Sequence, residues 1–233
     1  MCTSFVYRKK NIIVAMNFDN NGMPFEVSTK DPKVFSVLVD GGKGKMPSFG
    51  VNKEGTFINH LMVDSNGKGS YRRAGRKVTH TTKLVNDILY EIITPNELNE
   101  YLNNMEVVNV PDYSVHNMIS DKDGNVWIVE PGRKNIFSEF NESPYYVMTN
   151  FSLCDYKDKK EVAGDGLDRY EIVNDMLDKD HYLSVSDAFK VLQAVRQNGE
   201  WKTALSMVYS HIDKTVYYCY NGNFEEILTY QFS

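Results

Sequence analysis

The sequence predicts a mixed protein of the α+β class, in which sheets carry helices on separate faces. The chain has 233 residues, of which 42% are hydrophobic and 24% charged, so it can bury a large core without disulfides or metal. Strand-like segments occur in groups, separated by two groups of helical segments, instead of alternating with helices one by one. This order fits a four-layer αββα sandwich, and it also fits a two-layer α+β arrangement. No repeat, low-complexity stretch or linker is present, so we expect residues 1–233 to form a single domain.

The first third of the chain is predicted to be mostly sheet. Short runs rich in β-branched and aromatic residues alternate there with turn-forming residues. The predicted strands read TSFVY, NIIVAMNF, VFSVLVD, FGVN and TFINHLMV, and the breaks between them read DNNG, DGGKGK and NKEG.

Two helical segments follow. TTKLVNDILYEII places four apolar residues on one helical face, namely Leu84, Ile88, Leu89 and Ile92. TPNELNEYL opens with Thr94 as a cap, Pro95 at the first helical position and Glu97 three residues after the cap, which is the pattern of a capping box. We expect this pair of helices to cover a sheet.

The second half repeats the order of strands, helices and strands. YSVHNMISD and NVWIVEP flank the turn KDG, which predicts a hairpin, and YYVMTN reads as a further strand. Helices are predicted over residues 167–177 and in SVSDAFKVLQAVRQ, where Ser184 and Asp187 form a capping-box pattern. ALSMVYS, TVYYCYN and FEEILTYQF complete the chain as strands.

Charge and cysteine content limit the possible partners and location. The net charge of −5 argues against a nucleic-acid partner, and the basic stretch YRRAGRK at 71–77 is short enough to be an exposed loop instead of an anion site. Three cysteines give no disulfide framework. No apolar run is long enough for a membrane span or a signal segment, so we expect no membrane partner and a cytoplasmic location.

Neither a metal nor a phosphate-binding motif is recognisable. None of the five histidines shows metal-ligand spacing, so each is predicted to be structural or exposed; they are His60, His80, His116, His181 and His211. GGKGK at 41–45 lacks the spacing of a phosphate loop, and GDGLDRY at 164–170 matches no nucleotide fingerprint. We therefore predict that no cofactor or metal is needed.

Cys2 is the one residue that suggests catalysis by itself. If Met1 is removed, Cys2 carries a thiol and a free α-amine, whose ordinary pKa of about 8 lets it accept the thiol proton near neutral pH. Nucleophile and base would then share one residue. The alternative from the dipeptide alone is a small, inert, packed cysteine.

Several ordered motifs together resemble the choloylglycine hydrolase and penicillin V acylase family of N-terminal-nucleophile hydrolases. MCTS resembles the start of that family, MNFDN its R-N-x-D segment, and GVNKEG its G-x-N-E-K-G turn. HNMISDKDGNVWIVE resembles its central hairpin, YYVMTNFSLCDY its V-L-T-N-x-P-x-F-D-W stretch, and TALSMVYSHIDKTVYYCYN its closing strands. The resemblance implies the four-layer αββα sandwich with the nucleophile at the first strand.

The resemblance also implies roles for individual residues. Cys2 would be the nucleophile, and Asp19 would orient its amine, although Asp19 could instead be a strand-end turn residue. Asn150 would supply a side-chain donor to the oxyanion hole. Arg169 would lie close to the sulfur and favour the thiolate, although a surface ion pair with a neighbouring aspartate is its alternative.

Further residues are expected to bind substrate. The backbone N–H of Met62 matches the second oxyanion donor, and Asn59 lies on the same predicted strand. Asn17 matches the family's asparagine, and Phe18 is expected to line an apolar acyl pocket. Further lining residues of that pocket would be Leu61, Met62, Tyr145 and Phe151. Met16 stands where the family has arginine, which removes a cation beside the cysteine and argues against bile-salt specificity.

The resemblance implies an enzyme that cleaves a linear, non-peptide amide of a small N-acyl substrate through a thioester. Two alternatives remain at this point: an acyl-CoA-dependent N-acyltransferase, in which an amine captures the same thioester, and a non-catalytic binding protein on the same fold. A homo-oligomer is also left open.

Overall fold

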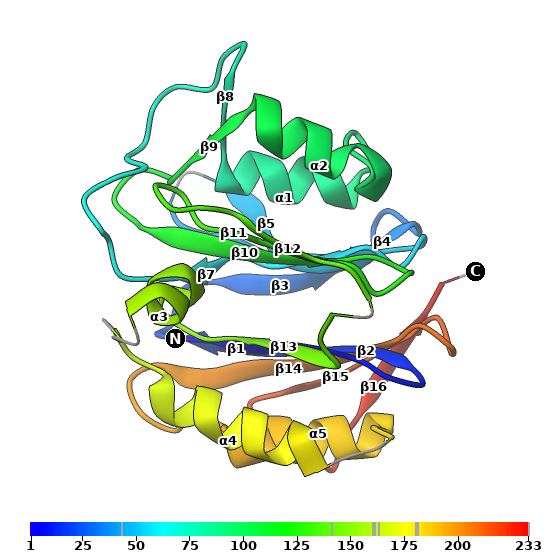
Figure 1. Cartoon of the computed structure of the whole chain (residues 1–233). Coiled ribbons are helices and arrows are strands. Elements are labelled where there is room, and N and C mark those ends of the chain that lie inside the picture. The colour runs from blue at the N-terminus through cyan, green and yellow to red at the C-terminus, as the bar shows by residue number, and fades with distance from the viewer. Residues whose placement is uncertain (43, 141, 160–161, 163, 180–181, 233) are drawn as a thin grey trace.

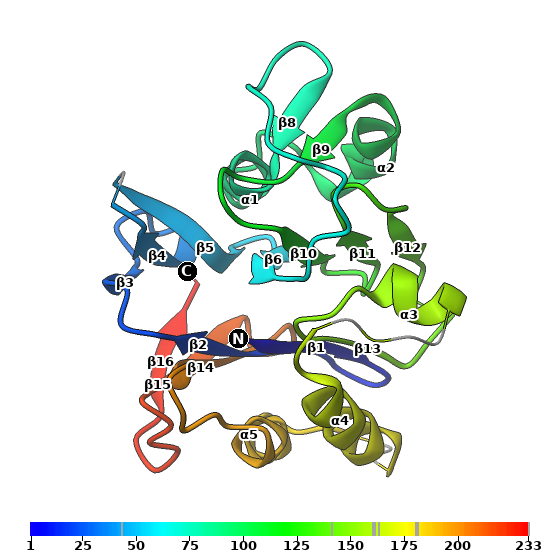
Figure 2. The same cartoon turned by 90° about the vertical axis from the view of Figure 1, so that its left-hand side faces the viewer.

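The computed structural model describes residues 1–42, 44–140, 142–159, 162, 164–179 and 182–232 (Figure 1). Four layers are stacked in it. Helices α1 (Thr81–Leu89) and α2 (Pro95–Asn104) cover one sheet, and helices α4 (Leu167–Lys179) and α5 (Val185–Ala194) cover the other, while the two sheets face each other in the middle (Figures 1 and 2). This is the predicted four-layer αββα sandwich, and the two-layer alternative is wrong.

The sheet beside α4 and α5, here called the lower sheet, has six antiparallel strands. Their spatial order is β13 (Tyr145–Met148), β1 (Thr3–Arg8), β2 (Ile12–Asn20), β14 (Lys202–Ser210), β15 (Thr215–Tyr220) and β16 (Leu228–Gln231). The first strand therefore lies inside this sheet, with β13 and β2 on either side of it.

The sheet beside α1 and α2, here called the upper sheet, has eight strands. Their order is β12 (Ile136–Ser138), β11 (Val126–Val129), β10 (Val115–Ser120), β6 (Phe57–Ile58), β5 (Lys45–Asn52), β4 (Val34–Asp40) and β3 (Phe25–Ser28), while β7 (Leu61–Met62) also pairs with β10. Strands β8 (Val78–His80) and β9 (Glu106–Val108) form a separate parallel pair. Helix α3 (Leu153–Lys159) follows β13.

Three hydrophobic clusters hold the layers together. One lies between the sheets, one between the lower sheet and α4 and α5, and one between the upper sheet and α1 and α2. Strand β2 shows how the sequence sorts side chains: Met16 and Phe18 belong to the cluster between the sheets, whereas Ile13 and Ala15 face the helices. Successive residues of a strand point to opposite faces, so each buried strand of the lower sheet contributes to two cores.

Both predicted capping boxes are present. The Glu97 carboxylate accepts a hydrogen bond from the Thr94 backbone N–H (3.0 Å). The Ser184 hydroxyl accepts from the Asp187 N–H (3.1 Å), and Asp187 accepts from the Ser184 N–H (3.4 Å). These pairs satisfy N–H groups that have no partner inside the helix.

Three local predictions were wrong. TFINHLMV is not one strand, because the pairing is interrupted between β6 and β7 at residues 59–60. Ile92 is not on the buried face of α1: Glu91 has φ of 57°, and the Ile92 N–H bonds back to the Asp87 carbonyl (2.8 Å), which ends the helix and leaves Ile92 64% exposed. Helix α3 was not predicted.

Candidate functional site

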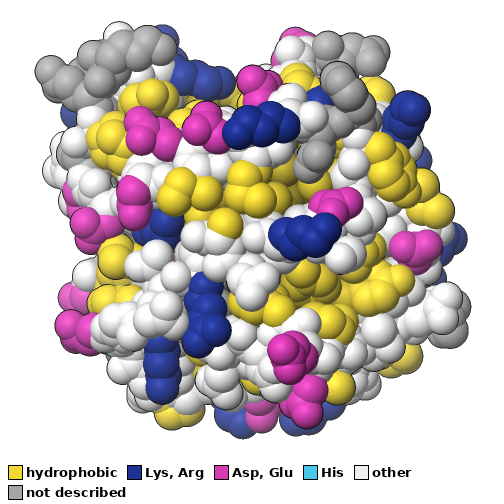
Figure 3. Space-filling model, turned by 90° about the horizontal axis from the view of Figure 1, so that it is seen from below, with side chains coloured by type: hydrophobic (Ala, Val, Ile, Leu, Met, Phe, Trp, Pro, Cys, Tyr) yellow, Lys and Arg dark blue, Asp and Glu magenta, His cyan; other side chains and the backbone are white. Residues whose placement is uncertain are grey.

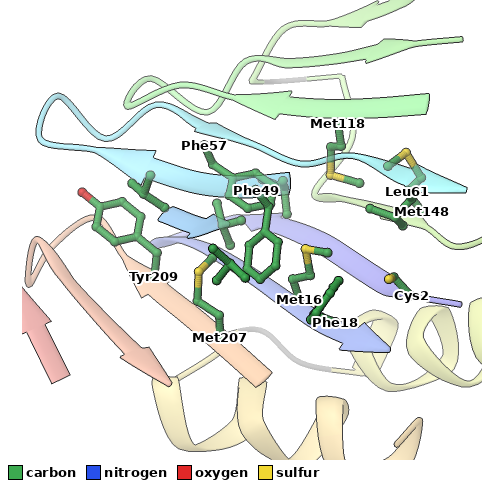
Figure 4. Packing of buried hydrophobic residues seen from close by; sticks show 14 of the residues in the cluster. Cys2, Met16, Phe18, Phe49, Phe57, Leu61, Met118, Met148, Met207 and Tyr209 are labelled. Atoms are coloured by element: carbon green, nitrogen blue, oxygen red, sulfur yellow. The ribbon is translucent and has the colours of Figure 1, made fainter. Parts of the chain in front are cut away.

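Cys2 immediately precedes β1 and points into the space between the sheets (Figure 4). The alternation of β1 explains this direction, since Val6 belongs to the same inter-sheet cluster while Phe5 and Tyr7 face the helices. Only 7% of the residue is exposed. The thiol therefore lies at the edge of an apolar layer, near the labelled side chains of Met16 and Phe18 (Figure 4).

The backbone and the thiol of Cys2 are both fixed by hydrogen bonds. Its backbone N–H donates to Asn150 Oδ1 (2.8 Å), and its Sγ lies 3.8 Å from the Asp19 carbonyl oxygen, to which the thiol donates. With Met1 in place, burial and the nearby Asp19 carboxyl raise the pKa of the Cys2 thiol to about 11, despite opposing effects of the terminal amine and Arg169. In this form the thiol is a poor nucleophile.

Asp19 lies near the end of β2, is 2% exposed, and has one carboxylate oxygen without a hydrogen bond from the described residues. Its Oδ1 accepts a hydrogen bond from the Thr203 hydroxyl (2.6 Å), whereas Oδ2 has no hydrogen-bond partner among the described residues. Burial raises the pKa of the Asp19 carboxyl to about 7, although Thr203, the terminal amine and Arg169 act in the opposite direction. Asp19 is a strand residue, so its alternative role in a turn is wrong.

Arg169 links three parts of the site. Its Nη1 donates to the Cys2 carbonyl oxygen (2.6 Å) and to Thr3 Oγ1 (2.8 Å), and its Nη2 donates to Asn150 Oδ1 (3.0 Å). The side chain comes from α4 and is 2% exposed, so the alternative of a surface ion pair is wrong. Nη1 also lies 4.0 Å from Asp19 Oδ2, which makes a buried ion pair. Arg169 is therefore placed to hold the residue that carries the thiol and to face the Asp19 carboxyl.

Gly166, just before α4, makes room for this arginine. Its φ is +105°, and a Cβ atom there would lie 2.7 Å from Arg169 Nη2 and 2.9 Å from the Thr149 side chain. The Gly166 carbonyl also accepts a hydrogen bond from Thr149 Oγ1 (3.1 Å). Only glycine combines this backbone conformation with so close an approach.

Asn150 follows β13 and bridges the two sheets. Its Oδ1 faces Cys2 in the lower sheet, and its Nδ2 donates to the Met62 carbonyl oxygen of the upper sheet (2.8 Å). Val63 N donates to the Ser114 carbonyl oxygen, so the next pair, Met62 with Val115, is a pair without mutual hydrogen bonds. The N–H and C=O of Met62 therefore both point away from β10 and toward Asn150.

Asn59 and Asn17 are placed elsewhere. Asn59 Oδ1 accepts from the Met118 N–H (2.8 Å), so this side chain connects the interruption between β6 and β7 to β10. Asn17 donates to the Leu192 carbonyl oxygen of α5 (2.8 Å) and accepts from the Ser206 hydroxyl (2.7 Å), on the helix-facing side of the lower sheet. The structure does not bring Asn17 to the side of the sheet on which the Cys2 thiol lies.

The predicted apolar lining is only partly assembled. Phe18, Leu61 and Phe151 belong to the same cluster as Cys2. Met62 is 38% exposed, whereas Tyr145 packs on the helix side of the lower sheet and donates from its hydroxyl to Asp178 (3.2 Å). Tyr145 therefore does not line the inter-sheet space. It shares the helix-facing side of β13 with Val147, whereas Met148 faces the other sheet.

Met16 is apolar where the R-N-x-D motif that MNFDN resembles has arginine. It is fully buried in the inter-sheet cluster that contains Cys2. An arginine there would carry its charge into the apolar layer, where an unpaired charge is costly. The site thus has Arg169 as its cation on the helix side and methionine sulfur on the inner side.

Thr203, His116 and Glu130 are polar neighbours of the site to which the sequence assigned no role there. Thr203 has no sequence signal at all, since it meets Asp19 across a bulged pair of β14 and β2. His116 and Glu130 could have been found from the predicted hairpin, because the register Asn117 with Val129 makes them the next pair along the strands.

The other sequence predictions about ligands concern surface and histidine residues. The stretch 71–77 is exposed, as predicted. His80 caps α1, and His60 bonds to Thr81, whereas the prediction for His181 lies outside the described residues. Within the described ranges no cluster of metal-ligating side chains was found. A groove of about 770 Å³ lies between α1, α2 and residues 74–79, and no predicted site residue lines it.

Figure 3 shows the face of the molecule seen from below, where acidic, basic and apolar side chains are interspersed. None of the helices in the described part of the chain is long and apolar enough to cross a membrane.

No protein-family model and no curated protein matches the sequence, but solved structures are similar to it. A cysteine-to-alanine variant of conjugated bile acid hydrolase from Clostridium perfringens superposes with a TM-score of 0.71 at 16% identity, over 99% of this chain and 92% of that one. Penicillin V acylase from Agrobacterium tumefaciens gives 0.66 at 17% identity, over 94% and 83%. The Caenorhabditis elegans ortholog of N-acylethanolamine-hydrolyzing acid amidase gives 0.62 at 13% identity, over 89% and 92%. The chain therefore has the fold of the choloylglycine hydrolase and penicillin V acylase family, the N-terminal-nucleophile hydrolase fold that its motifs predicted.

Proposed function

We propose that this chain is a cysteine amidohydrolase that cleaves a linear, non-peptide amide of a small N-acyl substrate through a thioester. The observation that carries the proposal is the surroundings of the Cys2 nitrogen. Asn150 Oδ1 accepts from it, Arg169 holds the adjoining carbonyl, and the buried Asp19 Oδ2, which accepts no hydrogen bond from the described residues, lies 4.0 Å from Arg169 Nη1. The three solved structures above are named as enzymes that act on conjugated bile acids, penicillin V and N-acylethanolamines.

Removal of Met1 would change the chemistry of this nitrogen. The peptide N–H becomes an α-amine, which can accept the thiol proton and can also bond to more than one acceptor. Asn150 Oδ1 already accepts from this atom, and Asp19 supplies a second acceptor that would stabilise the protonated amine. A positive amine beside the thiol also lowers the thiol pKa from the high value of the Met1-bearing form.

The reaction follows from these groups. The Cys2 sulfur attacks the amide carbonyl carbon while its proton passes to the α-amine, and a tetrahedral oxyanion forms. The C–N bond then breaks, and the leaving amine takes the proton from the α-ammonium. Water attacks the thioester, releases the carboxylic acid and restores the thiol.

Two N–H donors are available for the oxyanion. A carboxamide nitrogen carries two hydrogens, so Asn150 Nδ2 retains one after donating to the Met62 carbonyl oxygen. The Met62 N–H lies on the same strand edge as that carbonyl and points to the same side. One such preorganised donor is worth on the order of 3 kcal/mol of transition-state stabilisation.

The test is release of amine by the Met1-free protein from penicillin V, a conjugated bile acid and an N-acylethanolamine, measured by mass spectrometry. We expect turnover of at least one of them, with loss of ~1,000-fold or more in Cys2→Ala. Cys154→Ala is the matched control, because Cys154 is a free cysteine in α3, and its turnover should be unchanged. Equal turnover by the wild type and Cys2→Ala would contradict the proposal.

A further inference from the structure

His116 and Glu130 form a fully enclosed pair on the inner face of the upper sheet. Both side chains have no exposed surface, and His116 Nδ1 lies 3.1 Å from Glu130 Oε1. They are direct cross-strand neighbours, one pair beyond Asn117 with Val129. Met118 and Ile128, two residues away on each strand, belong to the inter-sheet cluster, so the alternation directs the His116–Glu130 pair toward the lower sheet.

The pair forms hydrogen bonds with the chain on both sides of Asn150. His116 Nε2 donates to the Thr149 carbonyl oxygen (2.8 Å). Glu130 accepts from the Ser152 hydroxyl (2.7 Å) and from the Leu153 and Cys154 N–H groups (2.9 and 3.2 Å). Residues 150–151 are therefore held on both sides by hydrogen bonds to His116 and Glu130, which belong to the upper sheet.

Every polar atom of the two side chains has a partner. Glu130 Oε1 bonds to His116 Nδ1 and the Leu153 N–H, and Oε2 bonds to the Ser152 hydroxyl and the Cys154 N–H. The Thr149 carbonyl oxygen can only accept, so His116 Nε2 is the donor in that bond. Loss of either side chain would leave buried partners unsatisfied.

We infer that His116 and Glu130 are positioning residues for the proposed reaction, which hold the Asn150 carboxamide between Cys2 and Met62. This role rests on the proposed function and goes beyond it, because the hydrogen bonds of the two side chains go to each other and to residues 149–154 instead of Cys2. Asn150 must satisfy a donor on the lower sheet and an acceptor on the upper sheet at the same time. By binding Thr149 and Ser152 from the upper sheet, the pair fixes the distance between the two sheets at Asn150, which must reach both Cys2 and Met62.

The test is a double-mutant cycle on acylation of the Met1-free protein by p-nitrophenyl acetate. The rate constant for the single acetyl group gained on Cys2 is measured by intact mass for the wild type, His116→Gln, Asn150→Ala and the double variant. We expect a loss of about 10-fold in His116→Gln and about 100-fold in Asn150→Ala, with the double variant within about 2-fold of Asn150→Ala. A residue that acts only through Asn150 has nothing left to position when the carboxamide is gone.

Two further variants complete the design. Glu130→Gln keeps the size of the side chain and replaces His116→Gln in the cycle if that protein does not fold. His211→Gln is the matched control, because this histidine packs on Tyr209 in the turn after β14, and its acylation rate should equal that of the wild type.

The outcomes separate the two proposals. Losses that multiply in the double variant, or a wild-type rate in His116→Gln and Glu130→Gln, would overturn the positioning role while leaving Cys2 as the nucleophile. Equal acylation of the wild type and Cys2→Ala would instead overturn the proposed function, and the positioning role with it.

Discussion

Asp19 couples folding of the unprocessed chain to pH. Burial raises its carboxyl pKa to about 7, whereas the ordinary value is about 4. The folded state therefore favours the protonated acid, and the associated stability is full below about pH 4 and is lost as the pH rises through 7. Holding a carboxyl beside Cys2 therefore destabilises the Met1-bearing fold above pH 7.

Asp19→Asn should therefore stabilise the Met1-bearing protein at high pH. A shift of about three pKa units corresponds to roughly 4 kcal/mol, so the variant should exceed the wild type by up to that amount at pH 8 and approach it at pH 4. Urea unfolding at the two pH values measures the difference. Asp168→Asn, at an exposed aspartate, is the control and should match the wild-type stability at both pH values. If Asp19→Asn differs from the wild type by the same free energy of unfolding at pH 4 and pH 8, the raised pKa of Asp19 is contradicted.

Arg169→Lys tests the connection between Cys2, Thr3 and Asn150. An ammonium group is a single point of donation and cannot reproduce the planar geometry with which guanidinium meets three acceptors. We expect the free energy of unfolding to fall by about 1–3 kcal/mol, the cost of leaving a buried polar group unsatisfied. Chemical denaturation gives this value. An unchanged midpoint and slope would show that these bonds contribute no net stability.

At the scale of elements, the turn before α4 decides where Arg169 enters the site. Gly166→Ala combines a backbone penalty with a clash against Arg169 and Thr149. Gly22 has a nearly equal φ of +102° but no atom within 4 Å of its added Cβ. Gly22→Ala should thus lose only the roughly 1–2 kcal/mol of the left-handed backbone.

The difference between these two variants isolates the contact with the site. We expect Gly166→Ala to lose about 1–3 kcal/mol more than Gly22→Ala in denaturant unfolding, as overpacking of a filled region does. It should also reduce the proposed Cys2 reactivity, which Gly22→Ala should leave intact. Equal losses in the two variants would mean that the turn tolerates a methyl group and that Arg169 can move.

The sequence predicted the elements whose signals are local. The two capping boxes and the hairpin at KDG depend on residues within a few positions of one another, and all three are present. Helix α3 has a local cap, since the Asp155 N–H donates to the Ser152 hydroxyl (3.0 Å), but its first two N–H groups bond to Glu130, 23 and 24 residues away in the chain. The interruption at Asn59 likewise depends on Met118 of another strand. These contacts with Glu130 and Met118 could not be predicted from neighbouring residues.

At the scale of the whole molecule, the site is assembled where two sheets meet. Cys2, Asp19 and Asn150 come from the lower sheet, and Met62 comes from the upper sheet. The motif resemblance predicted which residues gather, because their order along the chain is visible in the sequence. It did not predict which face of the sheet each side chain occupies, and Asn17 and Tyr145 form their hydrogen bonds on the helix side. Successive residues of a strand point to opposite faces, and only the packing of the sheets shows which face is the inner one.

The stability that the Glu130 carboxylate contributes between the sheets should be lost at acidic pH. Burial by itself would raise the pKa of Glu130, but the hydrogen bonds and charge of His116, with those of Ser152 and Leu153, lower it to about 2. The stability from this carboxylate is full above about pH 4 and is lost as the pH falls toward 2.

Glu130→Gln should therefore be less stable than the wild type by roughly 3 kcal/mol at pH 7, and the gap should narrow between about pH 4 and pH 2. Thermal or urea unfolding across this range measures it. A gap that stays constant down to pH 2 would show that Glu130 is not ionised in the folded protein.

The most direct test of Cys2 as a processed nucleophile is the intact mass of the purified protein before and after treatment with a thiol reagent, with Cys2→Ala alongside. We expect loss of Met1 and one rapid labelling event that is absent in the variant, since only the free α-amine activates this buried thiol. Retention of Met1, or labelling that Cys2→Ala leaves unchanged, would contradict the claim that Cys2 is a processed N-terminal nucleophile.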